Sequence, residues 1–250
     1  MSEGKKQSNF QITPGSGPID GLVAVAHELK TPLAIILHLA SSLEDDLTQA
    51  SPIDRKQSLQ RIRLSAGRTL NLVQGLTISH RLNTCDQLDF GFEMEPVNVS
   101  QVCQEAMHEI MPLAKACDQK INFSAPSSPQ LVVGNNDLLR GVFINLIDNA
   151  IKHNPPQTDV DVKIRRRNAR VRASVRDNGP GLTLADIRRL GSSLGKTLQP
   201  MQGRSGNSGI GLYIASQMAQ AMGGALSVGA VNKGAAFHVD LIQSKQLSLL

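Results

Sequence analysis

Three side chains near the N-terminus of the chain have the chemistry of group transfer: His27, Glu28 and Thr31. A neutral imidazole is a nucleophile, and an adjacent carboxylate accepts a proton from one ring nitrogen. Thr31 follows one helical turn later, on the same side as His27. Because His27 is two positions from both Val25 and Leu29, it points nearly opposite the apolar stripe of its helix. The pattern predicts an exposed nucleophilic histidine rather than a core histidine.

Two amides and an amine align on a second helix, predicted over 136–153. Asn145, Asn149 and Lys152 are spaced four and three residues apart, so they share one side of that helix. An amide oxygen can coordinate Mg²⁺, while N–H donors and an ammonium can contact phosphates. Asn is a poor helix former, and a solvent-exposed face more often carries Glu, Lys or Gln. The row therefore indicates a site for an anionic, metal-bound ligand.

A carboxylate ends the strand predicted over 171–175, whose alternate residues point inward. Asp177 keeps the inward phase, and a buried carboxylate needs a donor, which the exocyclic amine of adenine would supply. Gly179 and Gly181 follow in a turn that lets the backbone approach a planar base. The glycine-rich segment 203–212 precedes a helix and offers backbone N–H groups to phosphate. Taken alone, that last segment is explained equally well as a flexible loop.

The elements that must position these residues begin with two helices. Apolar residues recur every three or four positions over 19–49 and again over 59–76, with a break at Ser51-Pro52. Each helix has one apolar stripe, and one hairpin alone cannot cover both stripes. We therefore expect two chains to pair as a four-helix bundle, that is, a homodimer.

Beyond this hairpin the pattern becomes mixed α/β. A strand at 97–99 precedes a helix capped by Ser100, and three helices are expected in all. The other predicted strands are 121–124, 131–133, 160–164, 171–175, 226–228 and 236–241. This predicts an α+β chain whose second part is a sheet with helices on one face. The expected domains are a tail (1–17), the hairpin (18–83), a linker (84–96), the sheet domain (97–243) and a second tail (244–250).

Composition excludes several classes of protein. The 250-residue chain has a formal charge of +5, but only 3% aromatic residues and no Trp, which argues against nucleic-acid binding. No apolar run approaches the ~20 residues of a membrane helix, and no signal peptide is visible. The three cysteines form no C-x-x-C pair. We expect a cytoplasmic protein that does not insert into membranes.

Four segments resemble motifs of the sensor histidine kinases. H-E-L-K-T-P-L at 27–33 resembles their H box, and N-L-I-D-N-A-I-K-H at 145–153 resembles their N box. D-N-G-P-G-L at 177–182 and G-N-S-G-I-G-L at 206–212 resemble two glycine boxes of their Bergerat-type ATP-binding domain. The resemblance spans about residues 19–243. It implies a dimeric four-helix bundle followed by an α/β-sandwich ATP-binding domain.

The resemblance also implies roles for single residues. Asn145 would be a Mg²⁺ ligand, Asn149, Lys152 and His153 would lie near the phosphates of ATP, and Asp177 would read adenine. The glycine boxes would shape the base pocket and its lid through Gly179, Gly181, Gly206, Gly209, Gly211 and Leu212. Lys152 and Arg204 would neutralise phosphate charge.

The implied activity is that of an ATP-dependent protein-histidine kinase. Its γ-phosphoryl group would pass to His27 with Glu28 as general base, and then to an Asp of a response regulator. Thr31 would position water for dephosphorylation of the regulator, and a separate sensor protein would be a further partner. No Phe lies between Phe143 and Phe237, where the family has an aromatic F box, although Leu190, Leu194 and Leu198 could anchor a lid.

Two alternatives to a kinase remain open. The missing F box favours a catalytically degenerate dimeric scaffold, which would bind nucleotide and response regulators without phosphotransfer. An ATP-driven conformational machine of the same fold ranks last, because such proteins lack the H-box hairpin.

Overall fold

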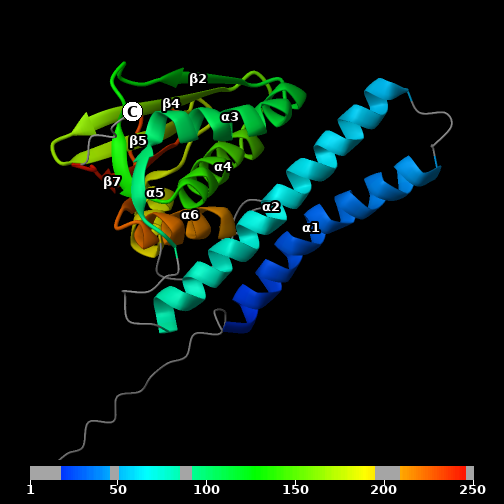
Figure 1. Ribbon diagram of the computed structural model, residues 1–250, viewed down its shortest axis with the longest axis horizontal. Coiled ribbons are helices and arrows are strands. Elements are labelled where there is room, and N and C mark those ends of the chain that lie inside the picture. Colours follow the sequence, from blue (N-terminus) through cyan, green and yellow to red (C-terminus); the bar gives the residue numbers. More distant parts are fainter. Residues whose placement is uncertain (1–17, 46–50, 85–91, 195–208, 246–250) are drawn as a thin grey trace, which may run out of the picture.

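The computed structural model describes residues 18–45, 51–84, 92–194 and 209–245. Figure 1 shows two parts: a long helical hairpin and an α/β domain that rests against its side. The expected succession of a hairpin and a sheet domain is confirmed.

The hairpin consists of α1 (Pro18–Asp45) and α2 (Pro52–Thr84). The predicted break at Ser51-Pro52 is confirmed, and Ser51 caps α2 there. Its Oγ accepts from the backbone N–H of Asp54 at 3.2 Å and donates to the Asp54 carboxylate at 2.7 Å. Pro52 fits the first helical turn because it needs no N–H partner. Among the described residues, no helix is long and apolar enough to cross a membrane.

The α/β domain begins with β1 (Glu95–Asn98) and α3 (Val99–Ala116). The remaining elements follow in this order: β2 (Lys120–Ser124), β3 (Leu131–Gly134), α4 (Asn136–Lys152), β4 (Asp159–Arg167), β5 (Arg170–Asp177), α5 (Leu184–Ser193), α6 (Ile210–Ala221), β6 (Ala225–Gly229) and β7 (Ala236–Ile242). Five strands form one sheet in the order β2-β4-β5-β7-β6, in which only β2 and β4 are parallel. β1 and β3 form a separate antiparallel pair.

The core lies between this sheet and a layer of helices. Alternate residues of the central strands, such as Val162 in β4 and Val175 in β5, are buried beneath the helices. The residues between them, such as Lys163 and Arg172, lie on the opposite, polar face. The helices α3, α4 and α6 lie on the same side of the sheet, as Figure 1 shows. The predicted sheet with helices on one face is confirmed, and this layering places one side of α4 at the edge facing the hairpin.

Two local predictions in the α/β domain are wrong. The cap of α3 is Asn98 rather than Ser100: the Asn98 side chain accepts from the Ser100 backbone N–H at 3.1 Å. Asn is as favoured as Ser at this position, so composition alone does not distinguish the two. The described part of the domain also contains four helices rather than three. The unexpected one, α5, is short and buries only Leu190 fully, so it has little apolar periodicity to detect.

Candidate functional site

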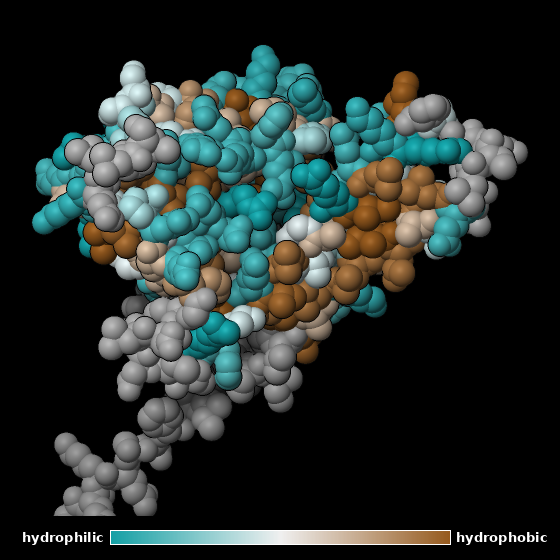
Figure 2. Space-filling view, in the orientation of Figure 1, coloured by the Kyte–Doolittle hydropathy of each residue, from teal (hydrophilic) through white to brown (hydrophobic). Residues whose placement is uncertain are grey.

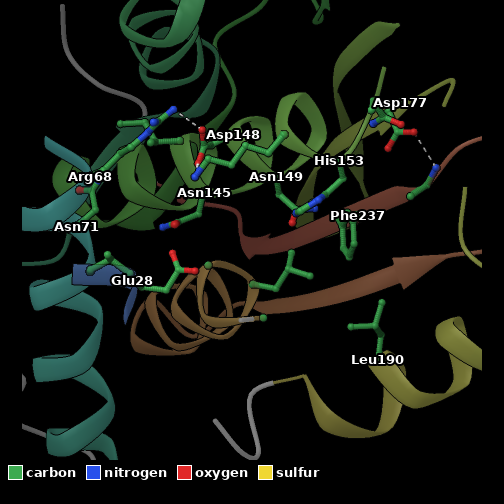
Figure 3. Close-up of a pocket in the computed structure, with 18 of the residues that line it drawn as sticks. Glu28, Arg68, Asn71, Asn145, Asp148, Asn149, His153, Asp177, Leu190 and Phe237 are labelled. Atoms are coloured by element: carbon green, nitrogen blue, oxygen red, sulfur yellow. Dashed lines mark hydrogen bonds and ion pairs between the residues drawn. The ribbon is translucent and has the colours of Figure 1, made fainter. Parts of the chain in front are cut away.

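A cavity of about 630 Å³ lies where the hairpin meets the α/β domain. Its walls come from α1, α2, α4, α5, the turn after β5 and the start of α6. Figure 3 shows side chains from these elements converging on one space. The residues brought together in this way are far apart in the sequence, from Glu28 to Phe237.

One side of α4 provides the polar wall of the cavity. Asn145, Asn149 and Lys152 all line it, so their predicted shared face is confirmed. His153, the C-cap residue of α4, lines it too, and Figure 3 shows it with Asn145 and Asn149. The Asn145 amide donates from Nδ2 to the Gly141 carbonyl oxygen at 2.9 Å. This bond orients the amide so that its Oδ1 is available as an acceptor. The free oxygen has the character of a ligand for a hard cation.

Asp148, which was not predicted from the sequence, lies beside this polar wall and connects α4 to the hairpin. Its carboxylate receives the Arg68 guanidinium of α2 at 2.5 Å and the Lys152 ammonium at 2.7 Å. The Asp148 side chain is only 14% exposed, so both ion pairs are partly shielded from water. The spacing of Asp148 and Lys152 by four residues was a local signal of their pairing. No local signal predicted Arg68, which is 80 residues away in the sequence.

Asp177 lies at the far end of the cavity from the hairpin. It is 6% exposed, which confirms the inward phase read from β5. Its Oδ1 accepts from the backbone N–H groups of Gly179 at 3.0 Å and Ala235 at 3.3 Å. These two bonds, one from each flanking segment, hold the carboxylate in place. Among the described residues no hydrogen bond to its Oδ2 is formed, so that oxygen remains as an acceptor.

The glycines around Asp177 permit the close approach of three chain segments. A Cβ on Gly179 would overlap Oδ1 of Asn154, and a Cβ on Gly234 would overlap the Asp177 carbonyl group. Gly181 has a φ of +81°, which favours glycine. Gly179 and Gly181 were predicted from the sequence, whereas Asn154, which lines the cavity just beyond α4, was not.

The start of α6 and the helix α5 close another side of the cavity. Gly209, Gly211 and Leu212 line it, with Gly209 in the left-handed conformation at the N-cap of α6. Leu190 of α5 lines it too and is buried, opposite Phe237 of β7 in Figure 3. Arg204, Gly206 and Leu198, also named from the sequence, lie outside the described residues.

The H-box residues of α1 are divided between this cavity and a neighbouring groove. Glu28 and Thr31 line the main cavity. His27 is exposed, as predicted, and lines a shallower groove together with His38 and Arg61. The Thr31 hydroxyl donates to the His27 carbonyl oxygen at 3.2 Å. The predicted nucleophile is therefore accessible beside the cavity and is not in it.

The α/β domain is held against the hairpin by closely fitted contacts along α2. A Cβ on Gly75 would lie closer than 3.0 Å to three side-chain carbons of Ile214 in α6, so only a glycine fits there. One turn further, the hydroxyl groups of Ser79 and Tyr213 form a buried hydrogen bond. Together with the Arg68–Asp148 ion pair, these contacts place the cavity beside the hairpin of the same chain.

Comparison with known proteins divides the chain in the same way. Residues 22–83 match the model of the His Kinase A (phospho-acceptor) domain. Residues 134–245 match the model of the histidine kinase-, DNA gyrase B-, and HSP90-like ATPase.

Curated relatives resemble the chain over most of its length. It is 28% identical over 209 residues to the sensor-like histidine kinase SenX3 of Mycobacterium tuberculosis, covering 84% of this chain and 50% of SenX3. It is 27% identical over 195 residues to the phosphate regulon sensor protein PhoR of Pseudomonas aeruginosa, covering 78% of this chain and 43% of PhoR. The chain thus spans about half the length of these relatives, or less.

A solved structure shares the fold. Full-length ShkA in complex with AMPPNP superposes with a TM-score of 0.60 at 23% identity, over 94% of this chain and 48% of that chain.

Proposed function

Because the chain belongs to the sensor histidine kinases, with a HisKA domain followed by a histidine kinase-type ATPase domain, we propose that it is an ATP-dependent protein-histidine kinase. In this proposal the γ-phosphoryl group of ATP passes to His27. It then passes to an aspartate of the receiver domain of a response regulator. The observation that carries the proposal is the shared cavity, in which Glu28 of the H box faces the Asn145–Asn149 wall of α4.

The nucleotide site is assigned along the length of the cavity. Asp177 accepts from the exocyclic amine of adenine through the oxygen that its backbone partners leave available. Asn149, Lys152 and His153 lie toward the hairpin and contact the phosphates. Gly179 and Gly181 shape the base pocket. The lid is assigned to Arg204, Gly206, Gly209, Gly211 and Leu212, with Arg204 adding positive charge near the phosphates.

Asn145 would hold a Mg²⁺ ion that accompanies the nucleotide. The donor set fits this role, since the fixed amide of Asn145 presents an oxygen to the cavity. The described residues contain no group of three or more His, Cys, Asp or Glu side chains that could hold a metal ion alone. A single amide ligand supports a cation that is bound mainly by phosphate oxygens and water. When bound, it neutralises charge that develops on the β- and γ-phosphates.

The residues of α1 supply the acceptor. The exposed imidazole of His27 is the nucleophile, and Glu28 orients it and takes its proton as general base. Thr31 positions water for dephosphorylation of the regulator. Because His27 remains accessible on the outside of the hairpin, a receiver domain can reach it after the transfer.

The assembly proposed with this activity is a cytoplasmic homodimer. Exposed apolar residues on both helices of the hairpin support pairing into a four-helix bundle: Leu33, Leu37, Leu59, Leu70 and Val73. Figure 2 shows the corresponding hydrophobic surface along the hairpin. A separate sensor protein is proposed as the source of input. The proposed domain limits are those predicted above, 18–83 and 97–243.

The experiment that tests the activity is labelling with γ-³²P-ATP and Mg²⁺. Wild-type protein should acquire acid-labile, base-stable phosphate, and His27→Gln should acquire none. His38→Gln is the matched control, because His38 is also exposed and lines the same groove, and this variant should label like wild type. If nucleotide binds but wild type is not labelled, the kinase proposal fails and the non-catalytic scaffold takes its place.

A further inference from the structure

We propose that His27 is phosphorylated in cis, by the ATP bound in its own chain. This inference rests on the proposed kinase activity and adds the identity of the acceptor chain. In a homodimer each nucleotide site has two histidines available, one on its own hairpin and one on the partner's. The structure favours the first, for reasons that come from the faces of α1 and from the packing of α2.

The first reason is that α1 of the same chain forms a wall of the cavity. Glu28, Thr31 and Ile35 line it, together with Asn145 and Asp177 of the α/β domain. His27 precedes Glu28, so it lies about 100° around the helix from the cavity-facing side. Transfer to His27 of the same chain therefore requires the α/β domain to shift across the surface of α1, from the side that carries Glu28 toward the side that carries His27.

The second reason is the position of the exposed apolar surface of α1, on which a second copy of the chain would pack. Leu33 and Leu37 of α1 are 46% and 69% exposed. Leu37 is nine residues from Glu28 and therefore lies about 180° around the helix from it, and Leu33 lies about 140° around. A partner hairpin packed on these leucines is separated from the cavity by α1 itself. The partner's histidine consequently lies on the far side of this chain's own helix.

The third reason is the close fit between α2 and the α/β domain. Gly75 contacts Ile214, Ser79 hydrogen-bonds to Tyr213, and Arg68 pairs with Asp148. Transfer to the partner would require the domain to leave all three contacts and move around the bundle. Transfer to His27 of the same chain also requires these contacts to open, but the domain then moves only across the hairpin on which it already rests.

The transfer itself is an in-line displacement at the γ-phosphorus. The lone pair of one ring nitrogen of His27 forms the N–P bond, while the bond from the γ-phosphorus to the β,γ-bridging oxygen breaks. The electron pair of the broken bond leaves with ADP. The proton on the other ring nitrogen passes to the Glu28 carboxylate of the same helix, so no further reactant is needed.

Heterodimers of defined composition test this inference. Two differently tagged and differently sized chains are co-expressed and purified through both tags, so that each dimer contains one of each. The trans-only dimer combines a His27→Gln chain with a chain in which Asn149→Ala and Asp177→Asn together should abolish nucleotide binding. The matched cis-only dimer combines a wild-type chain with one that carries all three substitutions. Label on each chain is followed by gel after γ-³²P-ATP is added.

The proposal predicts that the cis-only dimer labels its wild-type chain at about half the wild-type amount per dimer, since one of two sites remains. The trans-only dimer should stay at the background of His27→Gln. Label on the nucleotide-defective chain of the trans-only dimer, with none on the cis-only dimer, would overturn the inference while leaving the kinase activity intact. Absence of label on the wild-type homodimer would instead overturn the proposed function, so the two failures are distinguishable.

Discussion

At the level of single residues, the two carboxylate oxygens of Asp177 differ in their hydrogen bonding. Oδ1 is occupied by the backbone N–H groups of Gly179 and Ala235, which belong to segments on either side of the cavity. The carboxylate is thereby fixed at little cost, because each buried lone pair that it uses has a donor. The other oxygen keeps its acceptor character for a ligand. A neutral amide at this position could satisfy the backbone but not an incoming amine.

Asp177→Asn should therefore weaken adenine-nucleotide binding without unfolding the domain. The new side chain can place its oxygen toward Gly179 and Ala235, but its NH₂ then faces the amine of adenine, a donor against a donor. Loss of one such bond in a buried site corresponds to about 1–3 kcal/mol, or about tenfold or more in Kd. Isothermal titration with ADP measures the change. Asp137→Asn, an exposed carboxylate at the start of α4, is the control and should bind like wild type.

His238 lies on the polar face of the sheet and makes the stability of the domain depend on pH. Its Nδ1 is 2.8 Å from the Ser174 hydroxyl. Partial burial lowers the pKa of His238 below its ordinary value of 6.5, and the positive charges of Arg172 and Arg167 lower it further, while Asp240 opposes them. The folded protein therefore holds this imidazole neutral more strongly than the unfolded chain does.

We expect the contribution of neutral His238 to the free energy of unfolding to be complete above about pH 6.5. It should be lost as the pH falls below that value, because the unfolded chain then binds a proton more readily than the folded protein does. The free energy of unfolding in urea should drop between about pH 7.5 and about pH 5.5, and less so in His238→Gln. His108→Gln, which removes an exposed imidazole from α3, should keep the wild-type pH dependence. Equal drops in all three proteins would contradict the assignment.

At the level of elements, α2 packs through two faces, and the apolar pattern of the sequence predicts only one of them. Its apolar residues, such as Leu70 and Val73, recur at helical spacing and predict the bundle face. The second face carries Gly67, Asn71, Gly75 and Ser79 at intervals of four residues and packs on α3, α4 and α6. Small and polar side chains have no hydropathy signal, so the apolar pattern of the sequence did not predict this contact with the α/β domain. Their regular spacing was the signal that was available.

Gly75→Ala should destabilise the protein, although alanine normally stabilises a helix. In an isolated helix this change gains about 1 kcal/mol. Here the new methyl group would overlap the Ile214 side chain, and overpacking of this kind costs about 1–3 kcal/mol. Thermal unfolding should show a lower Tm for Gly75→Ala, and the addition of Ile214→Ala should cost less in this background than in wild type.

The control for Gly75→Ala is Gly191→Ala in α5, where an added Cβ meets nothing within 4 Å. That change should leave the stability unchanged or raise it by about 0.5 kcal/mol. If both glycine variants behave alike, the close approach of α2 and α6 is not a determinant of stability.

The residues of the site were predictable from the sequence wherever one element carried them. The shared face of Asn145 and Asn149 follows from helical periodicity, and the inward phase of Asp177 follows from strand alternation. The interactions that join site residues to other parts of the chain depend on tertiary packing. Examples are the ion pair of Asp148 with Arg68 and the hydrogen bond of Asp177 with Ala235. Helix α5 was not predicted for the same reason. It contributes Leu190 to the cavity, but its own sequence has little apolar periodicity.

At the level of the whole molecule, the α/β domain covers one side of the hairpin, and another side is exposed. The α/β domain packs along α2, whereas apolar residues such as Leu33, Leu37 and Leu59 remain exposed (Figures 1 and 2). Exposed apolar surface of this extent on two adjacent helices marks an interface. The cavity lies on the side of α1 that carries Glu28, about 140–180° around the helix from Leu33 and Leu37. Dimer formation and nucleotide binding should therefore be separable by mutation.

Leu33→Glu combined with Leu37→Glu should convert a dimer into a monomer and spare nucleotide binding. Two carboxylates on the apolar face cannot be buried against a second hairpin without partners. Sedimentation should then give the mass of one chain, 26.9 kDa, whereas wild type should give twice that value. ADP affinity should stay within about twofold of wild type, since neither leucine lines the cavity. Leu184→Glu, at an equally exposed leucine of α5, should remain a dimer. A doubly substituted chain that still sediments as a dimer would show that the copies meet through another surface, and the argument that α1 separates the partner from the cavity would lose its basis.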